Sequence, residues 1–383
     1  MLYYWSSKTS VDSIAQDLRT LSLNILSRAG FGKSFKFQGH DDMKKSDIPS
    51  PSSSYRQSLQ VILENAVLIL AFGTKFLANP WLPRKFRQVH EACASFQKYM
   101  TDLYEEEKSA IAEGRTTDSN LMTSLVRASQ EEAETTGGLT ESEIYGNMFT
   151  FNFAGHDTTA HTFTFAVYFL AAHPDVQDWL SEEIHGVLGE RQPQDWNYRA
   201  DFPRLKRCLS VMFETIRLYT PVPVLKWTNN QTQSFTYKGR TIVLPPQNMI
   251  APSYGSLQSD PRYWGSDSLN WRPSRWVKAA GGSANSIGQP GNEEMNLPVR
   301  GAFIGWSEGA RDCPGRKFSQ VEFVATIAVL FRHYRVDPLT MQGENIQDAR
   351  QRVKDLIKND SGSVLLLQML HPERAPLVWT KRS

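Results

Sequence analysis

The chain has 383 residues, of which 40% are hydrophobic and 21% are charged, and its formal net charge is +2. These values are typical of a globular protein with one large domain or two smaller ones. The nearly balanced charge excludes a strong field directed at nucleic acid, and no run of Lys and Arg indicates a polybasic membrane arm. No apolar run is long enough to predict a membrane-spanning helix.

The cysteine content argues against a disulfide framework. Cys93, Cys208 and Cys313 are odd in number and far apart in the sequence. They have no Cys-x-x-Cys spacing, which also argues against a zinc site. A reducing environment fits this pattern best.

Helical periodicity dominates as far as about residue 220. The first predicted element is an amphipathic helix that Gly30 ends. Its apolar stripe consists of Ile14, Leu18, Leu21 and Ile25. A polar loop is expected over 39–54, and further helices are expected over about 55–72 and 84–113. An acidic loop follows over about 130–138.

The clearest helix is predicted over about 140–172. Thr140 and Glu143 have the spacing of a capping box, in which the two side chains satisfy backbone N–H groups reciprocally. Pro174 cannot continue the helix. At this length the helix spans roughly 50 Å. Its middle is apolar on nearly every side, which is typical of a helix that is buried all round.

After about residue 220 the predicted elements change from helices alone to a mixture of helices and short strands. The expected elements are helices over about 174–189, 202–219 and 315–333, β-type runs within 222–251, a Gly/Ser/Asn-rich surface loop over 279–296, and hairpin-like strands around 363–380. We find no internal repeat. The pattern predicts a mainly α protein with a small β region, folded as a single domain.

Cys313 lies in a glycine-rich run, residues 303–315, that indicates a loop presenting a thiolate to an iron. Glycines at 305, 309 and 315 permit tight turns beside a flat ligand. The guanidinium of Arg311 suits a carboxylate partner such as a haem propionate. A lone cysteine is more often a small buried hydrophobic residue, but these neighbours favour the ligand interpretation.

A second motif lies inside the long helix. Gly155 in a helix interior costs about 1 kcal/mol relative to Ala, so it suggests a notch in which a small molecule sits. Asp157 and Thr158 would then form a proton-delivery pair. Alternatively, Thr158 and Thr159 bond to carbonyls one turn earlier and Asp157 faces solvent. We interpret His156 as a side chain that is satisfied and binds no metal.

Glu214 and Arg217 form a third motif, because residues three apart on a helix share a face. Most such pairs lie on the surface and contribute little, but the apolar flanks here predict a buried pair. A buried pair of this kind calls for a second cation nearby. Arg275, between Pro273 and Trp276, can supply it.

Taken together and in this order, the motifs resemble those of the haem-thiolate monooxygenases, the cytochromes P450. Residues 154–159 match the family's Ala/Gly-Gly-x-Asp/Glu-Thr-Thr segment, and Glu214 and Arg217 match its Glu-x-x-Arg. The ligand loop is matched at Gly309, Arg311, Cys313 and Gly315. The matches at Pro273 and Arg275 depart from the family pattern at Ser274 and Trp276, and Trp306 replaces the usual Phe. These features are similar to those of filamentous-fungal members.

The resemblance implies a haem b cofactor with the Cys313 thiolate as axial ligand. It implies that Asp157 and Thr158 deliver protons to dioxygen and that Gly155 makes room for it. Arg311 and Lys226 would contact the propionates, and Gly309 and Gly315 would belong to the cofactor-binding loop. Glu214, Arg217 and Arg275 would form a structural triad that holds this loop.

The resemblance also implies the reaction and its partners. One oxygen atom from dioxygen would enter an apolar small molecule, with electrons from NADPH through a flavoprotein reductase that docks on the Cys313 side. We expect a monomer without a nucleic-acid partner. The intact family member would sit at the cytosolic face of the endoplasmic reticulum membrane. We expect this chain, 1–383, to be one domain that lacks the family's N-terminal part and its anchor.

Three other functions stay open at this point. The first is a reductase-independent haem-thiolate isomerase or dehydratase, against which the intact Asp157 and Thr158 argue. The second is a non-catalytic remnant or haem-binding scaffold. The third, a generic helical interaction protein, leaves the Cys313 loop and the Gly155 notch unexplained.

Overall fold

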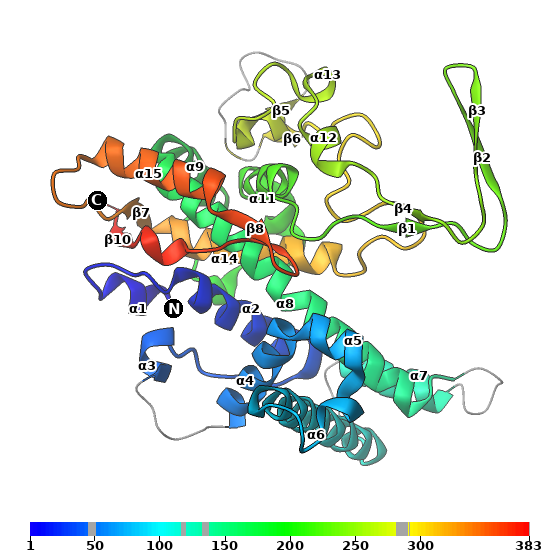
Figure 1. Ribbon diagram of the computed structural model, residues 1–383. Coiled ribbons are helices and arrows are strands. Elements are labelled where there is room, and N and C mark those ends of the chain that lie inside the picture. The colour runs from blue at the N-terminus through cyan, green and yellow to red at the C-terminus, as the bar shows by residue number, and fades with distance from the viewer. Residues whose placement is uncertain (45–50, 116–119, 132–137, 281–289, 291, 383) are drawn as a thin grey trace. The chain divides into compact units, whose positions relative to one another are not determined.

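The computed structural model describes residues 1–44, 51–115, 120–131, 138–280, 290 and 292–382. The chain forms two compact units. The first consists of Met1–Ser7 and Ser13–Ala160, and the second of Lys8–Asp12 and His161–Ser383 (Figure 1). The single domain expected over 1–383 stays a prediction.

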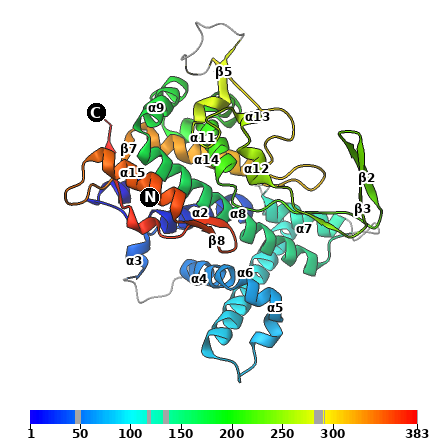
Figure 2. The ribbon, with the colours of Figure 1, turned by 45° about the horizontal axis from the view of Figure 1, so that its top comes forward.

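All the secondary-structure elements among the described residues of the first unit are helices. Its helices are α1 (Leu2–Ser6), α2 (Ile14–Phe31), α3 (His40–Lys44), α4 (Pro51–Glu64), α5 (Ala66–Leu77), α6 (Arg84–Ala112), α7 (Leu121–Glu131) and the first part of α8 (Glu141–Ala172). Helices α4 and α5 both pack against α6 (Figure 2). Leu59, Phe96, Met122 and Ile144 belong to its buried apolar core, so α4, α6, α7 and α8 each contribute one apolar face.

Several predicted boundaries in this unit need correction. The helix expected to end at Gly30 ends at Phe31, because Gly32 takes the left-handed conformation (φ 68°) that closes a helix. The polar loop 39–54 contains α3 and the start of α4. The helix expected over 55–72 is two helices, α4 and α5. Within the two expected loops, residues 45–50 and 132–137 lie outside the described part of the chain.

The long helix α8 has the predicted position and cap. The N–H of Thr140 donates to Glu143 at 2.8 Å, and the N–H of Glu143 donates to the Thr140 hydroxyl at 3.3 Å. The expectation that α8 is buried on every side is confirmed for residues 159–172. It is wrong for residues 141–158, several of which are exposed. The earlier turns bury Ile144 and Met148 but leave other positions exposed, because only one face meets the core.

The second unit combines helices with small sheets. Its α-helices are the end of α8, α9 (Pro174–Leu188), α10 (Tyr198–Asp201), α11 (Lys206–Leu218), α12 (Tyr254–Gln258), α13 (Pro261–Trp264), α14 (Arg316–Arg332) and α15 (Ile346–Asn359). Short 3-10 turns span Pro193–Asp195, Phe202–Arg204, Pro273–Trp276 and Pro372–Arg374. The helix expected over 202–219 therefore begins at Lys206, and the sequence did not reveal α15.

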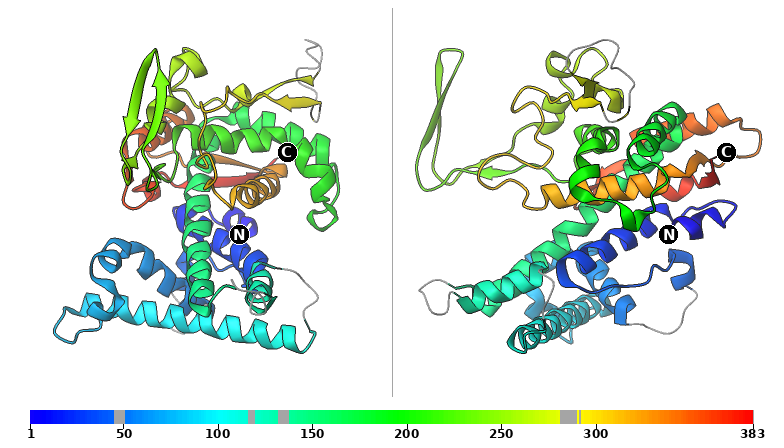
Figure 3. Two further views of the ribbon diagram at one scale, coloured as in Figure 1. Left: turned by 90° about the vertical axis from the view of Figure 1, so that its right-hand side faces the viewer. Right: turned by 180° about the vertical axis from the view of Figure 1, so that it is seen from behind.

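The strands form two-stranded antiparallel sheets. The pairs are β1 (Lys226–Trp227) with β4 (Met249–Ile250), β2 (Gln233–Tyr237) with β3 (Arg240–Leu244), β5 (Val277–Ala279) with β6 (Glu293–Met295), β7 (Tyr334–Pro338) with β10 (Leu377–Lys381), and β8 (Ser361–Ser363) with β9 (Leu367–Met369). Figure 3 shows β2 and β3 extending away from the helices of the second unit. Strands β5 and β6 occupy the ends of the loop expected over 279–296, of which 281–289 and 291 are not described.

A segment far from β10 in the sequence extends its sheet. The N–H of Val11 donates to the carbonyl of Leu377 at 2.8 Å, and the N–H of Leu377 donates back to Val11 at 2.9 Å. In the described part of the chain, no helix combines the length and the apolar character needed to cross a membrane.

Candidate functional site

The Cys313 loop ends where α14 begins. The N–H of Cys313 donates to the carbonyl of Trp306 at 2.9 Å, and the N–H of Arg316 donates to the carbonyl of Cys313 at 3.2 Å. Ser307 and Gly309 have φ values of 66° and 90°, which the tight path of the loop requires. Cys313 itself is exposed and in no disulfide.

The surroundings of the Cys313 sulfur have opposing effects on the pKa of its thiol. Partial burial has the larger effect and raises the pKa of the thiol, while the backbone N–H groups of Gly315 and Arg316 lower it. The sulfur also lies at the N-terminus of a 17-residue helix, where the macrodipole favours a negative charge. An accessible sulfur with N–H donors suits a thiolate bound to the iron of a haem, so these residues fit that group.

Close packing fixes the start of the loop on α11 and α14. A Cβ added at Gly305 would lie 2.5 Å from Cγ2 of Ile216, so only glycine permits this approach. The indole N–H of Trp306 donates to the Ser319 hydroxyl at 3.1 Å. Thus Trp306, at the position where the family usually has Phe, adds a hydrogen bond that ties the loop to α14.

Lys226 lies beside the same loop. From β1, its Nζ donates to the carbonyl of Arg311 at 3.3 Å. The side chain of Arg311 is exposed. Lys226 and Arg311, the two residues expected to contact the propionates, are therefore neighbours in the structure.

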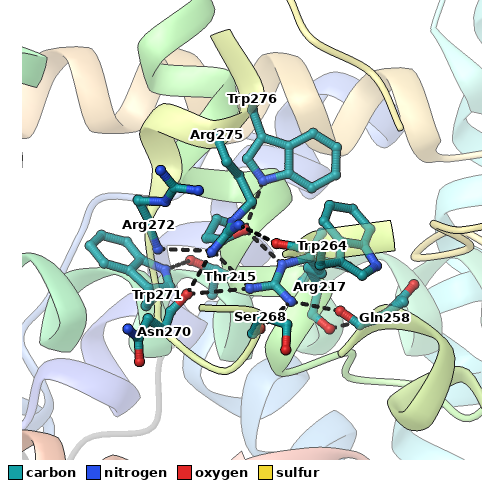
Figure 4. Close-up of polar contacts among 12 residues, drawn as sticks. Thr215, Arg217, Gln258, Trp264, Ser268, Asn270, Trp271, Arg272, Arg275 and Trp276 are labelled. Atoms are coloured by element: carbon teal, nitrogen blue, oxygen red, sulfur yellow. Dashed lines mark hydrogen bonds and ion pairs between the residues drawn. The ribbon is translucent and has the colours of Figure 1, made fainter. Parts of the chain in front are cut away.

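Glu214, Arg217 and Arg275 meet in a buried network. Glu214 and Arg217 are both fully buried and form two hydrogen bonds, of 2.8 and 2.9 Å. Nε of Arg275 donates to the same carboxylate at 2.9 Å. Figure 4 shows the side chains of Arg217, Arg275 and Trp276 converging on this point.

Two further donors complete the surroundings of Glu214. The indole N–H of Trp276 donates to it at 2.8 Å, and so does the backbone N–H of Arg272. A phenylalanine, which the family pattern has in place of Trp276, could not donate. Every buried oxygen of the carboxylate thus has charged or polar partners, which offsets the desolvation of its charge.

Gln258 connects this network to the Cys313 loop. Arg217 donates to the carbonyl of Gln258 at 2.6 Å, and the side-chain oxygen of Gln258 accepts the N–H of Ile304 at 2.9 Å. An aromatic contact joins the same two regions, since the ring centroids of Trp276 and Phe303 are 4.9 Å apart. Gln258 was not predictable from the sequence, since it belongs to no recognisable motif.

In the α8 motif, the hydroxyls of Thr158 and Thr159 bond to carbonyls of the same helix. The hydroxyl of Thr158 donates to the carbonyl of Ala154 at 2.8 Å, and that of Thr159 donates to the carbonyl of Gly155 at 3.3 Å. His156 is buried and its Nδ1 lies 2.7 Å from the carbonyl of Asn152. This is the satisfied histidine expected from the sequence.

Helix α2 packs against this motif. Nε of Arg19 lies 3.0 Å from Oδ1 of Asp157, which is 8% exposed, so this carboxylate does not face solvent as one alternative required. A Cβ added at Gly155 would lie 3.1 Å from Cδ2 of Leu26. The missing side chain thus has a packing role with α2, which the sequence did not indicate.

The expected site residues fall into two groups. Gly309, Arg311, Cys313, Gly315, Lys226 and the three residues of the triad belong to the second unit. Gly155, Asp157 and Thr158 belong to the first. Within each unit the expected neighbours come together.

The cytochrome P450 family model matches residues 1–365. The chain belongs to the cytochrome P450 family. It is similar to a cytochrome P450 monooxygenase of Arthrobotrys oligospora, at 27% identity over 96% of this chain and 66% of the relative. A phomenoic acid biosynthesis cluster cytochrome P450 monooxygenase of Leptosphaeria maculans is 30% identical over 92% of this chain and 63% of its own length.

A third relative, a cytochrome P450 monooxygenase of Penicillium roqueforti, is 28% identical over 98% of this chain and 65% of its own length. The P450 chain thus spans 63–66% of the length of these three fungal relatives. A crystal structure of a cytochrome P450 (CYP102L1) superposes with a TM-score of 0.67, at 20% identity, over all of this chain and 75% of that one. The mainly α fold with a small β region is therefore that of the P450 family.

Proposed function

We propose that this P450 chain is a haem-thiolate monooxygenase that inserts one oxygen atom from dioxygen into an apolar small molecule. The observation that carries the proposal is the exposed Cys313 at the start of α14, in a loop joined by Gln258 to the buried network of Glu214. The similarity to fungal P450 monooxygenases supports the same reaction class.

In this proposal the thiolate of Cys313 would bind the iron of haem b. When bound, a haem with a thiolate ligand supplies the electron density that favours O–O cleavage. The N–H groups of Gly315 and Arg316 stabilise the sulfur as a thiolate and limit its charge. Arg311 and Lys226 supply positive charge for the propionates, and Gly309 and Gly315 allow the loop to approach the flat group.

The remaining site residues are proposed to position groups and to move protons. Thr158, bonded to the carbonyl of Ala154, would exchange that bond for one to a reacting oxygen. Asp157, held by Arg19, would supply the proton that the hydroxyl passes on. Glu214, Arg217 and Arg275 would keep the Cys313 loop fixed while the cofactor is bound.

The partners and the place of action are also proposals. We propose that NADPH supplies electrons through a flavoprotein reductase that docks on the Cys313 side, because inserting one atom of dioxygen and reducing the other to water consumes two electrons. Fungal secondary metabolism, at the cytosolic face of the endoplasmic reticulum membrane, is the proposed setting. The name of the Leptosphaeria maculans relative is consistent with it.

The ligand assignment can be tested by spectroscopy. Residues 1–383 are expressed with haem supply, reduced and exposed to carbon monoxide, and the Soret band is recorded. We expect the thiolate signature, its loss in Cys313→Ala and its retention in Cys93→Ala. A histidine-type spectrum would contradict the assignment, and a chain that takes up no haem would favour the non-catalytic remnant.

A further inference from the structure

The imidazole rings of His185 and His333 lie next to each other on the surface of the second unit. Their centroids are 5.7 Å apart and their planes are tilted by 44°. Both residues are exposed, so solvent reaches the rings. We call His185 and His333 the histidine pair.

The ring nitrogens of the histidine pair are available to a ligand. Within the residues that the structure describes, no hydrogen bond or ion pair involves either ring. Four other histidines differ, since each has an oxygen 2.7–3.1 Å from Nδ1, namely His90, His156, His173 and His371. A neutral imidazole has one nitrogen with a free lone pair, which is the form that binds a metal.

The fold fixes the spacing of the histidine pair. His185 is in the last turn of α9, and His333 is the residue that follows α14. These two helices pack against each other (Figure 1), and the neighbouring Ile184 and Phe331 are fully buried. Each ring therefore sits at a helix C-terminus, where the macrodipole favours a cation.

The distance between the rings suits a shared metal ion. Two imidazoles on one tetrahedral ion, with metal–nitrogen bonds of about 2.0–2.1 Å, have ring centroids roughly 5–6 Å apart. The observed 5.7 Å lies in this range. The tilt of the ring planes also shows that the contact is not a stacking interaction.

Nearby charges decide which ions suit the histidine pair. Partial desolvation has the largest effect and lowers the pKa of His333, Arg332 and Lys381 lower it further, and Glu190 opposes them. One carboxylate beside two cations does not suit Ca²⁺ or Mg²⁺, which require several oxygen ligands. Neutral imidazole suits transition-metal ions such as Zn²⁺, Ni²⁺ and Cu²⁺.

We propose that the histidine pair binds one divalent transition-metal ion, with water as its remaining ligands. The bound ion joins the end of α9 to the end of α14 and thereby stabilises the second unit. The inference goes beyond the proposed function and does not rest on it, since neither histidine belongs to the haem site. The site contains no cysteine, so it differs from the zinc sites that the cysteine spacing argues against.

The test is isothermal titration calorimetry of residues 1–383, without a histidine tag, with Ni²⁺ slightly above neutral pH. We expect one site, and His185→Gln and His333→Gln should each bind Ni²⁺ at least ~tenfold more weakly. The double variant should bind no more weakly than either single variant, because both rings belong to one site. Ca²⁺ and Mg²⁺ should give no heat of binding.

Two controls separate the histidine pair from other ligands of the chain. His371→Gln should keep the affinity for Ni²⁺, since His371 is an exposed histidine of the second unit outside the pair. Cys313→Ala should also keep it, because that sulfur is no ligand of this site. Circular dichroism checks that each variant is folded, and in thermal unfolding Ni²⁺ should stabilise the wild type but not His333→Gln.

Three results would overturn the proposal. The first is the absence of Ni²⁺ binding, and the second is an equal loss of affinity in His333→Gln and His371→Gln. The third is binding that Cys313→Ala abolishes, which would place the metal ion at the sulfur instead.

Discussion

Glu214 accepts five hydrogen bonds at the centre of the second unit's buried network. Its two oxygens accept from Arg217, Arg275, Trp276 and the backbone of Arg272. We predict that Glu214→Gln lowers the free energy of unfolding by about 3–5 kcal/mol, because it leaves the buried guanidinium of Arg217 without its counter-charge and leaves Arg275 with Asp267 alone. Urea denaturation followed by circular dichroism measures this loss.

The control for this prediction is Glu308→Gln. Glu308 lies 3.9 Å from Arg300, and both side chains are exposed. Exposed pairs contribute about 0–1 kcal/mol, so this variant should unfold close to the wild-type midpoint. Equal losses in the two variants would show that burial of the network is not what matters.

Gly305 offers a second prediction at the scale of one side chain. Gly305→Ala places a Cβ 2.5 Å from Ile216 and 2.9 Å from the ring of Phe303. We expect it to lower the free energy of unfolding by about 1–3 kcal/mol through overpacking. Gly146→Ala in α8 meets no atom within 4 Å, and we expect it to raise that free energy by up to about 1 kcal/mol. Thermal unfolding of both variants gives the comparison.

The sequence indicated individual residues well where a motif surrounded them. The pairing of Glu214 with Arg217 followed from their spacing and apolar flanks, and Arg275 from the need for a second cation. The contribution of Trp276 was noted only as a departure from the family pattern, although its indole N–H binds Glu214. Arg19 and Leu26 escaped prediction, because their contacts with Asp157 and Gly155 join helices far apart in the chain.

At the scale of elements, the N-terminus of α11 is capped from α9. The carboxylate of Glu183 accepts the N–H of Arg207 at 2.7 Å and that of Cys208 at 3.0 Å. Burial nevertheless dominates and raises the pKa of Glu183 to about 7, from 4.5. The folded protein therefore binds this proton more tightly than the unfolded chain does.

The consequence is a loss of stability as the pH rises. The contribution of Glu183 is fully favourable below pH 4.5 and decreases until about pH 7. We predict that Glu183→Gln removes on the order of 1–3 kcal/mol of this pH dependence. Denaturant unfolding across that pH range measures the slope. Glu190→Gln, which changes an exposed glutamate after α9, should keep the wild-type slope.

Helices were predictable where the apolar periodicity agreed with residues that begin or end a helix. Helix α8 has both a capping box and Pro174, and its limits were predicted within one residue. Helix α15 was missed, because Ala349, Val353 and Ile357 are its only buried residues and most of its other positions are charged or polar. Helices α4 and α5 were merged, since the apolar pattern continues across the break at Asn65.

At the scale of the whole molecule, the motifs were sufficient for the family and its mainly α fold. They could not predict which distant segments pair, because short ladders carry no sequence signature. The clearest case is Val11 with Leu377, which lie at opposite ends of the sequence and exchange two hydrogen bonds.

This pairing gives a prediction for the second unit. Val11→Pro removes the N–H that donates to Leu377 and disturbs the return bond. We expect the amide of Leu377 to exchange with solvent at least about fivefold faster in Val11→Pro than in Val11→Ala. The alanine variant is the matched control, because it loses the apolar side chain and keeps the N–H. Equal exchange in both would mean that the ladder does not protect β10.

The pairing of Val11 with Leu377 also constrains how the protein is made. Residues 1–7 and 13–160 form the first unit and can fold while synthesis continues, but the sheet that contains Val11 has to wait until β10 leaves the ribosome. The loop closed by this contact includes nearly the whole chain, so closing it costs much conformational entropy and the contact forms late in folding. A nascent chain halted before residue 377 should therefore hold a folded first unit beside an unfinished second one, the state in which a chaperone would find it.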